Sequence, residues 1–579
     1  MIKVDSLSFS FPQKELYHNV SFTLEDAQHC AFIGTSGSGK STLIDILRDP
    51  ERYLYDGTIE LDPDCSMGYV SQFPELDYAN ETTVFEYIGE PFIKLQQDMQ
   101  AICVEMETSA DIEPLLEKYQ LALDAWDAMG GDDYENKIHK GLNAANLMKR
   151  RDCKAADLSG GEFKLVQVMK EMLHRPDMII MDEPDVFLDF DNLNALKDLI
   201  NSYKGTLLVV THNRYLLNHC FNKILHLENT EIQEFDGRYI EYSFSLLQAK
   251  VELQEIAVAE QEELDRNDTI INHLRVVATY NSNASRGRAL KARVRFQERL
   301  EARRIKAPFV EIKQPRISFE LDHKVRDAPA VRVREYSVGF DELLLDKVSF
   351  DIQSTDKVAI IGANGTGKTT LLRDVFHHNH PSITISSDAK VAYLSQSQGE
   401  MLQDAYTIFE EFIDAGFPTY EEIEAYLSSY GFEGEVLQQR IGSLSGGEKN
   451  LLQLAKISAS QANVLLLDEP TSHLDTYAQL ALEKAIEQYQ GAILMISHDF
   501  YSVVNGMDYV LMIEDKTIRK MTLPAFREMI YASHFDQGYL EMEQQKKTLE
   551  MAIERALEAT NFELAKGLVD ELEALIQRL

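Results

Sequence analysis

The sequence predicts an α/β protein with two similar halves, a helical segment between them and a helical extension after the second half. Three observations lead to this prediction. A series of short motifs occurs twice in the same order, helix-forming residues fill the stretch between the two series, and a further helix-rich stretch follows the second. Because 579 residues exceed what one hydrophobic core usually holds, we expect several compact units.

The composition is that of a globular protein with a strong acidic excess. Hydrophobic residues make up 44% of the chain and charged residues 26%, which excludes a disordered or fibrous class. The 95 acidic and 57 basic residues give a net charge of −38. Such a charge repels nucleic acid unless the basic residues are gathered in one place.

No feature of the sequence indicates export or membrane insertion. The N-terminus lacks a basic region followed by an apolar core, and no apolar run approaches the roughly 20 residues that cross a bilayer. The five cysteines show no zinc-binding spacing, and we expect them to be reduced and mostly buried. We therefore expect a cytoplasmic protein without a membrane segment.

The internal duplication rests on equal spacing. In each half an LSGGE segment is followed after 24 residues by a glutamate and after another 29 by a histidine, namely Ser159, Glu183 and His212, then Ser445, Glu469 and His498. Upstream, the distance from Gln72 to Ser159 exceeds that from Gln396 to Ser445 by 38 residues. The first half therefore carries an insertion, within about 85–140, whose pattern predicts helices. This insertion is either an arm for a partner or a helical subdomain that enlarges the first half.

Four regions follow from these patterns. Residues 1–242 and 328–533 form the two halves, and residues 243–327 form a linker in which helix-forming runs flank the polar stretch TYNSNASRGR. This order predicts a helical hairpin with its tip at about 279–287. Residues 534–579 form a helical C-terminal extension.

Each half contains a glycine-rich loop of the pattern GxxxxGK[ST] between a short apolar strand and a helix. Such loops bind phosphates, because glycines let backbone N–H groups point inward and the helix N-terminus adds partial positive charge. Lys40 and Lys368 are expected to reach the β- and γ-phosphates of a nucleoside triphosphate, and Ser41 and Thr369 to bind Mg²⁺. The expected nucleotide-binding residues of the two loops are Gly34, Thr35, Ser36, Gly37, Ser38, Gly39, Lys40, Ser41 and Thr42, and Gly362, Ala363, Asn364, Gly365, Thr366, Gly367, Lys368, Thr369 and Thr370.

Two carboxylates end a buried strand in each half, in MIIMDEP and VLLLDEP. Asp182 and Asp468 are expected to hold Mg²⁺, and Glu183 and Glu469 to polarise the attacking water as catalytic residues. A surface turn would explain such carboxylates in isolation, but the matching phosphate loops favour the catalytic interpretation. The remaining candidates are the histidines His212 and His498, placed near the γ-phosphate, and Gln72 and Gln396, placed near the metal and the water.

With LSGGE at 158–162 and 444–448, the motifs occur in the order of the ATP-binding cassette (ABC) superfamily, which both halves resemble. The resemblance implies ATP hydrolysis with Mg²⁺ between two cassettes that close face to face, here within one monomer. Each LSGGE segment would then complete the site of the opposite loop. Ser445, Gly446 and Gly447 would complete the site around Lys40, and Ser159, Gly160 and Gly161 would complete the site around Lys368.

The resemblance also implies that Phe11 and Phe340 stack on adenine. They precede the two loop lysines by 29 and 28 residues, where the superfamily has an aromatic residue. Each would otherwise be an ordinary core phenylalanine.

Two cassettes joined by a helical hairpin, without membrane segments, resemble the ABC-F family of ribosome-binding ATPases. Residues 286–306 carry nine basic and two acidic residues, and basic side chains three or four positions apart would form one helix face suited to a phosphate backbone. The expected RNA-binding residues are Arg286, Arg288, Lys291, Arg295, Arg299 and Arg303. The alternative is a solvated face paired with the acidic helix before it. The resemblance implies binding to the ribosomal E site, with the linker directed at P-site tRNA and the peptidyl-transferase centre of the large-subunit rRNA, as a translation factor or in protection against antibiotics.

The sequence departs from the ABC-F pattern at three places. The first half has DEPDVFLD where the family usually has DEPTNHLD, so Asp185, Val186 and Phe187 replace Thr, Asn and His, whereas DEPTSHLD in the second half is close to standard. This difference predicts unequal hydrolysis rates at the two sites. Leu165 and Leu451 stand where many relatives have an arginine after LSGGE, and the tail resembles a UVR-type helical hairpin.

Two other classes of function stay open at this point. One is the ATPase subunit of an ABC transporter, against which the long basic hairpin argues. The other is a DNA-repair ABC ATPase, prompted by the tail and opposed by the lack of zinc-finger cysteines.

Overall fold

The computed structural model describes the chain apart from residues 1, 12–13, 63–64, 73–81, 109–111, 187, 281–290, 292, 298–313, 322–327, 341–342, 397–398, 400, 535–536 and 579. The chain forms two compact units. The first contains residues 1–236 and 314–530, and therefore both cassettes. The second contains residues 237–313 and 531–579. Each unit is thus built from two separate stretches of chain.

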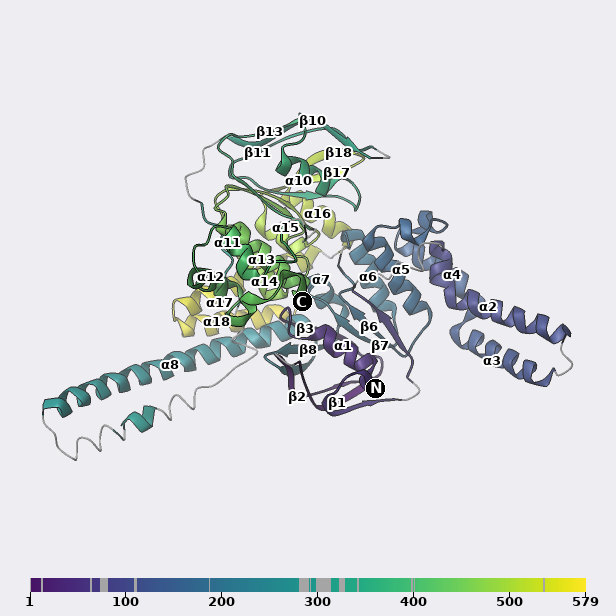
Figure 1. Cartoon of the computed structure of the whole chain (residues 1–579), viewed down its shortest axis with the longest axis horizontal. Helices are drawn as coiled ribbons and strands as arrows, with labels where there is room; N and C mark the ends of the chain where they lie inside the picture. Colours follow the sequence, from purple (N-terminus) through teal and green to yellow (C-terminus); the bar gives the residue numbers. More distant parts are fainter. Residues whose placement is uncertain are drawn as a thin grey trace. The chain divides into compact units, whose positions relative to one another are not determined.

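A six-stranded sheet forms the centre of the first cassette (Figure 1). Its strands are β3 (His29–Gly34), β5 (Met67–Val70), β6 (Met178–Asp182), β7 (Thr206–Val210), β8 (Lys223–Glu228) and β9 (Glu231–Asp236). They lie in the order β5-β6-β7-β3-β8-β9, with all neighbours parallel except β8 and β9. The inner strands are apolar along almost their whole length because both faces of a parallel sheet are covered.

The other elements of the first cassette cover this sheet. A three-stranded antiparallel sheet contains β1 (Ile2–Phe11), β2 (Lys14–Leu24) and β4 (Asp56–Leu61). The covering helices are α1 (Lys40–Arg48), α5 (Gly160–Leu173), α6 (Phe190–Ser202) and α7 (Arg214–Cys220). Residues of both sheets and of α1 share one core, which includes Tyr17, Phe22, Phe32 and Leu43.

The second cassette repeats this topology strand for strand. Its central sheet has the order β14-β15-β16-β12-β17-β18, and its small sheet the order β11-β10-β13. The strands are β10 (Pro329–Gly339), β11 (Leu343–Gln353), β12 (Lys357–Ile361), β13 (Ile383–Ile385), β14 (Val391–Leu394), β15 (Val464–Asp468), β16 (Ala492–Ile496), β17 (Tyr509–Glu514) and β18 (Thr517–Thr522). The helices are α10 (Lys368–His377), α11 (Ile408–Asp414), α12 (Tyr420–Leu427), α13 (Gly446–Ala459), α14 (Thr476–Gln488), α15 (Phe500–Gly506) and α16 (Leu523–His534). The duplication predicted from motif spacing is confirmed.

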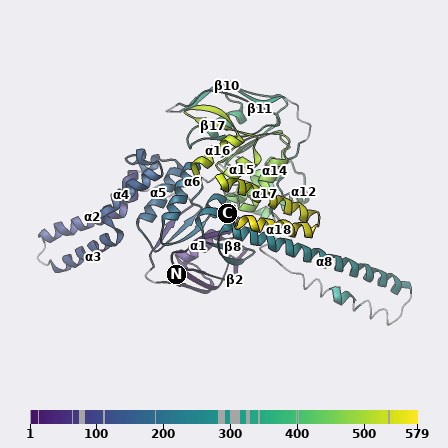
Figure 2. The ribbon, with the colours of Figure 1, turned by 180° about the vertical axis from the view of Figure 1, so that it is seen from behind.

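The insertion of the first cassette is helical. It contains α2 (Val84–Thr108), α3 (Glu113–Met129) and α4 (Tyr134–Ala144), and α2 and α3 run side by side in both views (Figure 2). At its base Phe92 stacks on Tyr134 with 4.8 Å between ring centroids, and Trp126 meets both rings edge-on. This aromatic cluster holds the root of the hairpin to α4.

The second unit combines the linker with the C-terminal helices. The linker begins as one continuous helix, α8 (Tyr239–Tyr280), as a run of helix formers without glycine or proline predicts. The tail forms α17 (Gln537–Glu558) and α18 (Phe562–Ile576), which pack on the first half of α8 through an apolar cluster including Ile240, Val251, Ile553 and Leu572. An ion pair of 2.6 Å between Lys566 and Glu255 also joins the tail to α8.

The cysteines are free thiols, as expected, but the expectation that most are buried is wrong. Cys30 and Cys220 are buried, whereas Cys103 is exposed and the other two are half-buried. Cys103 lies in α2, a hairpin helix in which most side chains beyond the base face solvent. Among the described residues, no helix is both long and apolar enough to cross a membrane.

Candidate nucleotide sites

The two glycine-rich loops lie where the sequence places them, each between a central strand and the helix that follows. Residues 34–42 connect β3 to α1, and residues 362–370 connect β12 to α10. Gly39 and Gly367 cap these helices with φ of 108° and 92°, a left-handed conformation that favours glycine. A side chain at Gly39 would also come within 2.9 Å of the Tyr17 hydroxyl. Both loops are therefore held in the conformation that directs N–H groups inward.

Both loop lysines are buried and bind their own loop in the same way. Lys40 Nζ donates to the carbonyl oxygens of Gly34 and Thr35 at 2.8 and 3.0 Å. Lys368 Nζ donates to the equivalent oxygens, of Gly362 and Ala363, at 2.7 and 2.8 Å. Burial lowers the pKa of both lysines because it disfavours the charged form. The negative charge of a bound triphosphate would favour the charged form of both lysines.

Each loop also brings a hydroxyl to a buried carboxylate. Thr369 Oγ1 lies 3.3 Å from Asp468 Oδ1, and the Ser41 hydroxyl makes a hydrogen bond to Asp182. Burial raises the pKa of each aspartate to about 6. Hard oxygen donors of this kind fit Mg²⁺, and a divalent cation would favour the ionised carboxylates. The residues present therefore fit the expected metal.

The candidate catalytic glutamates have an unusual backbone conformation in both cassettes. Glu183 and Glu469 have φ of 46° and 50°, in a region that residues other than glycine rarely adopt. Their N–H groups extend the sheet by donating to Val210 and Ile496 of the neighbouring strands, each at 2.9 Å. The same conformation at equivalent positions of both cassettes directs each carboxylate out of the strand end and into its site.

The two glutamates have different partners. Oε2 of Glu183 accepts a hydrogen bond from Gln72 Nε2 at 2.7 Å and lies 3.2 Å from Nδ1 of His473, a residue of the other cassette. Burial opposes ionisation of Glu183, but the contact with His473, together with the nearby His212 and Lys40, outweighs it and lowers the pKa to about 2. Glu469 contacts His498 of its own cassette, through the backbone N–H at 3.2 Å and Nε2 at 3.6 Å. Burial and the charge of Asp468 raise the pKa of Glu469.

The cassettes face each other through the loops after the paired carboxylates, 184–189 and 470–475, which we call the D-loops. Asp475 Oδ2 accepts a hydrogen bond from the backbone N–H of Ser36 at 3.1 Å. Asp189 Oδ2 accepts one from the N–H of Asn364, the equivalent loop position, at 3.4 Å. These aspartates also cap the helices α6 and α14. This role was not predicted from the sequence, although Asp at the same place in both DEPxxxLD segments, just before a helix, indicates a helix cap.

Each LSGGE segment begins a helix with the serine as cap. Ser159 and Ser445 form capping boxes with Glu162 and Glu448 at the start of α5 and α13. Ser445 Oγ lies 3.2 Å from Ser36 Oγ of the first cassette. A side chain at Gly447 would come within 2.4 Å of the same Ser36 oxygen, so only glycine allows this approach. The second LSGGE segment therefore lies against the loop of Lys40, in the crossed arrangement that the family resemblance implies.

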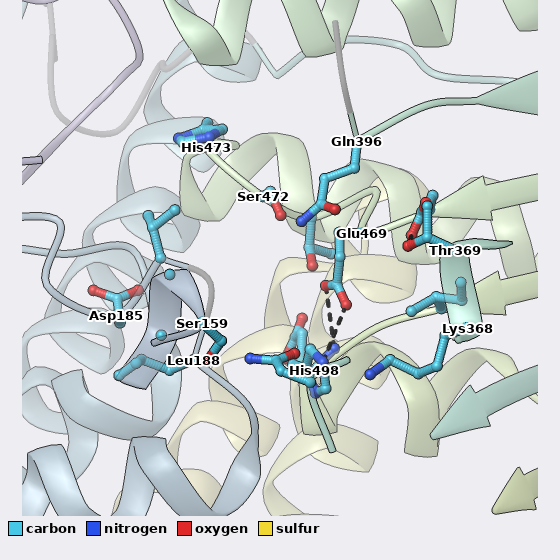
Figure 3. Close-up of a pocket in the computed structure, with 18 of the residues that line it drawn as sticks. Ser159, Asp185, Leu188, Lys368, Thr369, Gln396, Glu469, Ser472, His473 and His498 are labelled. Carbon is cyan, nitrogen blue, oxygen red and sulfur yellow. Dashed lines mark hydrogen bonds and ion pairs between the residues drawn. The ribbon is translucent and has the colours of Figure 1, made fainter. Parts of the chain in front are cut away.

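A cavity of about 630 Å³ lies at the site around Lys368, between residues of both cassettes. Figure 3 shows Ser159 and Leu188 of the first cassette on one side, and Lys368, Thr369 and Glu469 of the second on the other. Gly160, Gly161, Gln396 and His498 also line it. This volume lies within the usual range of about 300–1,000 Å³ for small-molecule sites. The cavity also reaches Glu183 and His473, so we call only its part around Lys368 the second site, and the region around Lys40 the first site.

The two candidate adenine-stacking residues are exposed. Phe11 is 48% and Phe340 is 79% accessible, and Phe340 lines the second site. A core role for either ring is therefore excluded. An exposed aromatic face beside a phosphate loop is suited to stacking on a base.

The structure describes part of the basic linker face. Lys291 and Arg295 lie on the described segment of the second linker helix and are exposed. This segment packs against α8, where Asn267 Nδ2 donates to Gln297 Oε1 at 3.0 Å. The other expected RNA-binding residues, Arg286, Arg288, Arg299 and Arg303, lie outside the described residues, as does the tip at 281–287.

An ion cluster between the cassettes has no counterpart in the sequence predictions. Arg214 at the start of α7 contacts Glu483 on α14 and Asp499, with 3.1 Å to Asp499 Oδ2. The guanidinium also lies 4.7 Å from the centre of the Tyr501 ring. At the equivalent position the second cassette has Phe500, which cannot form such ion pairs.

Comparisons with known proteins find relatives over most of the chain. A family model described as "ABC transporter" matches residues 17–186 and 345–472. The uncharacterised ABC transporter ATP-binding protein YfmM of Bacillus subtilis is 30% identical over 520 residues, which cover 86% of this chain and 96% of YfmM. The energy-dependent translational throttle protein EttA of Escherichia coli K12 is 29% identical over 523 residues, 87% of this chain and 90% of EttA.

A solved structure shares the fold over most of the chain. It contains an archaeal ribosome recycling factor, aABCE1, in complex with the ribosomal stalk protein aP1. The TM-score is 0.55 at 18% identity, with 91% of this chain and 92% of the other covered. The tandem arrangement of two cassettes is therefore a known architecture.

Proposed function

We propose that this chain, which belongs to the ABC-F family of ATP-binding-cassette ATPases, couples ATP hydrolysis to the binding and release of ribosomes during translation. The observation that carries the coupling is the reciprocal contact between cassettes. Each phosphate loop donates a backbone N–H to the D-loop aspartate of the other cassette, at Ser36 and at Asn364. Nucleotide bound at either loop is therefore sensed directly by the opposite half.

In this proposal the loop residues hold the triphosphate. Lys40 and Lys368 transfer their hydrogen bonds from loop carbonyls to the β- and γ-phosphates. The serine and glycines of each LSGGE segment bind the γ-phosphate from the other side, since a hydroxyl and N–H donors at a helix start suit phosphate oxygens. Phe11 and Phe340 cover the adenine.

The metal and water are held by oxygen and nitrogen side chains at the strand ends. Ser41 and Asp182 in the first site, and Thr369 and Asp468 in the second, would hold Mg²⁺, which neutralises phosphate charge when bound. Gln72 and Gln396 lie beside them. Glu183 and Glu469 orient and polarise the attacking water, and His212 and His498 orient these carboxylates.

The translation role rests on the relatives and on the linker. EttA is named a translational throttle protein, and this chain covers 90% of its length. The basic residues of this acidic chain gather at 286–306, and the described ones, Lys291 and Arg295, are exposed. We therefore propose a cytoplasmic factor that binds the E site and directs its linker toward P-site tRNA and the peptidyl-transferase centre in large-subunit rRNA, as a translation factor or in protection against antibiotics.

A double variant tests this proposal. Glu183→Gln with Glu469→Gln should bind ATP without hydrolysing it, and should co-sediment with ribosomes in ATP but not in ADP. The same protein carrying Lys291→Glu and Arg295→Glu should bind ATP equally well and ribosomes more weakly. If the double variant pellets no more than background with ATP, the ribosomal role is wrong.

A further inference from the structure

The D-loops differ in sequence at one position, which in the second cassette holds the residue that contacts the opposite glutamate. Counting four residues from each catalytic glutamate gives His473 in the second cassette and Phe187 in the first. His473 is 13% exposed, and its Nδ1 lies 3.2 Å from Oε2 of Glu183. The second cassette thus places a hydrogen-bonding ring on the catalytic carboxylate of the first.

Two contacts converge on one oxygen of Glu183. Gln72, from the same cassette, and His473, from the other, both lie at Oε2. With Oε2 held from two sides, Oε1 keeps a fixed direction in which to accept a proton from water. His473 lies in the same D-loop as Asp475, which binds the first phosphate loop.

The carboxylate of Glu469 is held differently. Among the residues that the structure describes, its hydrogen bond and ion pair come from His498 of its own cassette, and its Oε1 has no hydrogen-bond partner. Phe187 lies outside the described residues, but a phenyl side chain cannot donate a hydrogen bond in any position. At this D-loop position the first cassette therefore has no side chain that could give Glu469 the hydrogen bond that His473 gives to Glu183.

We infer that His473 is a positioning residue for Glu183, which makes the first site the faster hydrolytic site and leaves the second site to retain its nucleotide longer. The inference rests on the proposed roles of Glu183 and Glu469. A carboxylate fixed in the direction of the water reaches the reactive geometry more often than one held from one side. Because the contact crosses between cassettes, turnover at the first site requires the second D-loop to be docked. Hydrolysis is thereby coupled to cassette closure.

Single-site backgrounds test this inference. Glu469→Gln leaves only the first site active, and Glu183→Gln leaves only the second, so phosphate release in each variant reports one site. We expect Glu469→Gln to retain the larger share of the wild-type rate. In that background His473→Phe should lower kcat by about 10-fold or more, with little change in KM for ATP. His473→Asn should restore most of the rate, because its amide can donate to Oε2 from a similar position.

The second background provides the matched control. In Glu183→Gln, His473→Phe should lower the residual rate clearly less than in Glu469→Gln, since the described contacts of Glu469 come from His498 and His473 only lines the same cavity. An equal loss in both backgrounds would mean general damage to the interface and would overturn the inference. So would an unchanged kcat for His473→Phe beside Glu469→Gln, or a faster second site. Wild-type hydrolysis by Glu183→Gln with Glu469→Gln would instead refute the proposed roles of the glutamates themselves.

Discussion

Replacement of Arg214 by methionine is expected to weaken the closed arrangement of the two cassettes. The guanidinium is 12% exposed and lies between Glu483, 7% exposed, and Asp499, 18% exposed, both from the other cassette. Methionine keeps much of the side-chain volume but leaves both carboxylates without this cation. Removing one partner of a buried ion pair typically costs about 3–5 kcal/mol, because the remaining charge is uncompensated.

We expect the lower end of this range, about 3 kcal/mol. Glu483 keeps a hydrogen bond from Asn505 at 3.3 Å, Asp499 keeps one from the Tyr501 N–H, and the one Ser502 hydroxyl hydrogen stays available to either carboxylate. At 1.4 kcal/mol per factor of ten, ATP-driven closure should become about 100-fold weaker. If this loss of about 3 kcal/mol lowers the free energy of unfolding of one cassette-sized domain, Tm should fall by roughly 6–12 °C.

Calorimetry without nucleotide and an ATP titration of cassette closure would measure both effects. Arg334→Met is the matched control, because Arg334 forms a 2.7 Å ion pair with Asp351 on the exposed surface of the second cassette. That pair should contribute little to Tm. Arg214→Met with Glu483→Gln should be less destabilised than the sum of the single variants. If Arg214→Met had the same Tm as the surface control, the contacts of Arg214 with Glu483 and Asp499 would not stabilise the interface between the cassettes, and the reasoning would be refuted.

Three further outcomes are expected. Gly447→Ala should lower ATPase activity by about 10-fold or more and also lower Tm, because its methyl group would meet Ser36 of the first cassette and the His473 carbonyl oxygen of its own; normal kinetics would contradict the contact. Leu572→Ala, in the buried face of α18, should cost about 2–4 kcal/mol in unfolding of the second unit, whereas exposed Leu564→Ala should be neutral by the same denaturation assay. Burial lowers the pKa of His174 to about 4, so the unfolded chain takes up its proton first as pH falls below about 6.5. Stability should therefore fall between about pH 6.5 and 4, and His174→Gln should flatten that part of the denaturation profile; an identical slope would exclude His174 as a cause.

The sequence predicts the architecture well because its strongest signals are local. GxxxxGK[ST] needs only a strand, a turn and a helix, and the equal spacing of Ser159–Glu183–His212 and Ser445–Glu469–His498 implies the duplication that the two sheets show. The crossed placement of Ser445 against Ser36 followed from family resemblance, since no local pattern indicates which half an LSGGE segment faces.

What the sequence did not predict depends on contacts between distant residues. Arg214 and Glu483 are 269 positions apart, and nothing in either neighbourhood indicates the other. In the sequence, His473 is only one residue of a DEPTSHLD segment that is close to standard. Its contact with Glu183 crosses between the cassettes, so it could be found only from the three-dimensional structure. The positive φ of Glu183 was equally hidden, because backbone conformation at a strand end is set by the adjoining strand, through the bond to Val210.

The split construction of the second unit has a consequence for how the protein is made. The apolar face of α8 around Val251 is covered by α17 and α18, which lie roughly 300 residues later in the chain. At about 5–20 residues per second, α8 waits on the order of 15–60 s during synthesis before its partners emerge. The cassettes can fold during synthesis. A chain truncated before α17 would contain two intact cassettes and a linker helix whose apolar face around Val251 is exposed to solvent. Such nascent products should depend on chaperones and be preferred targets of quality-control proteases.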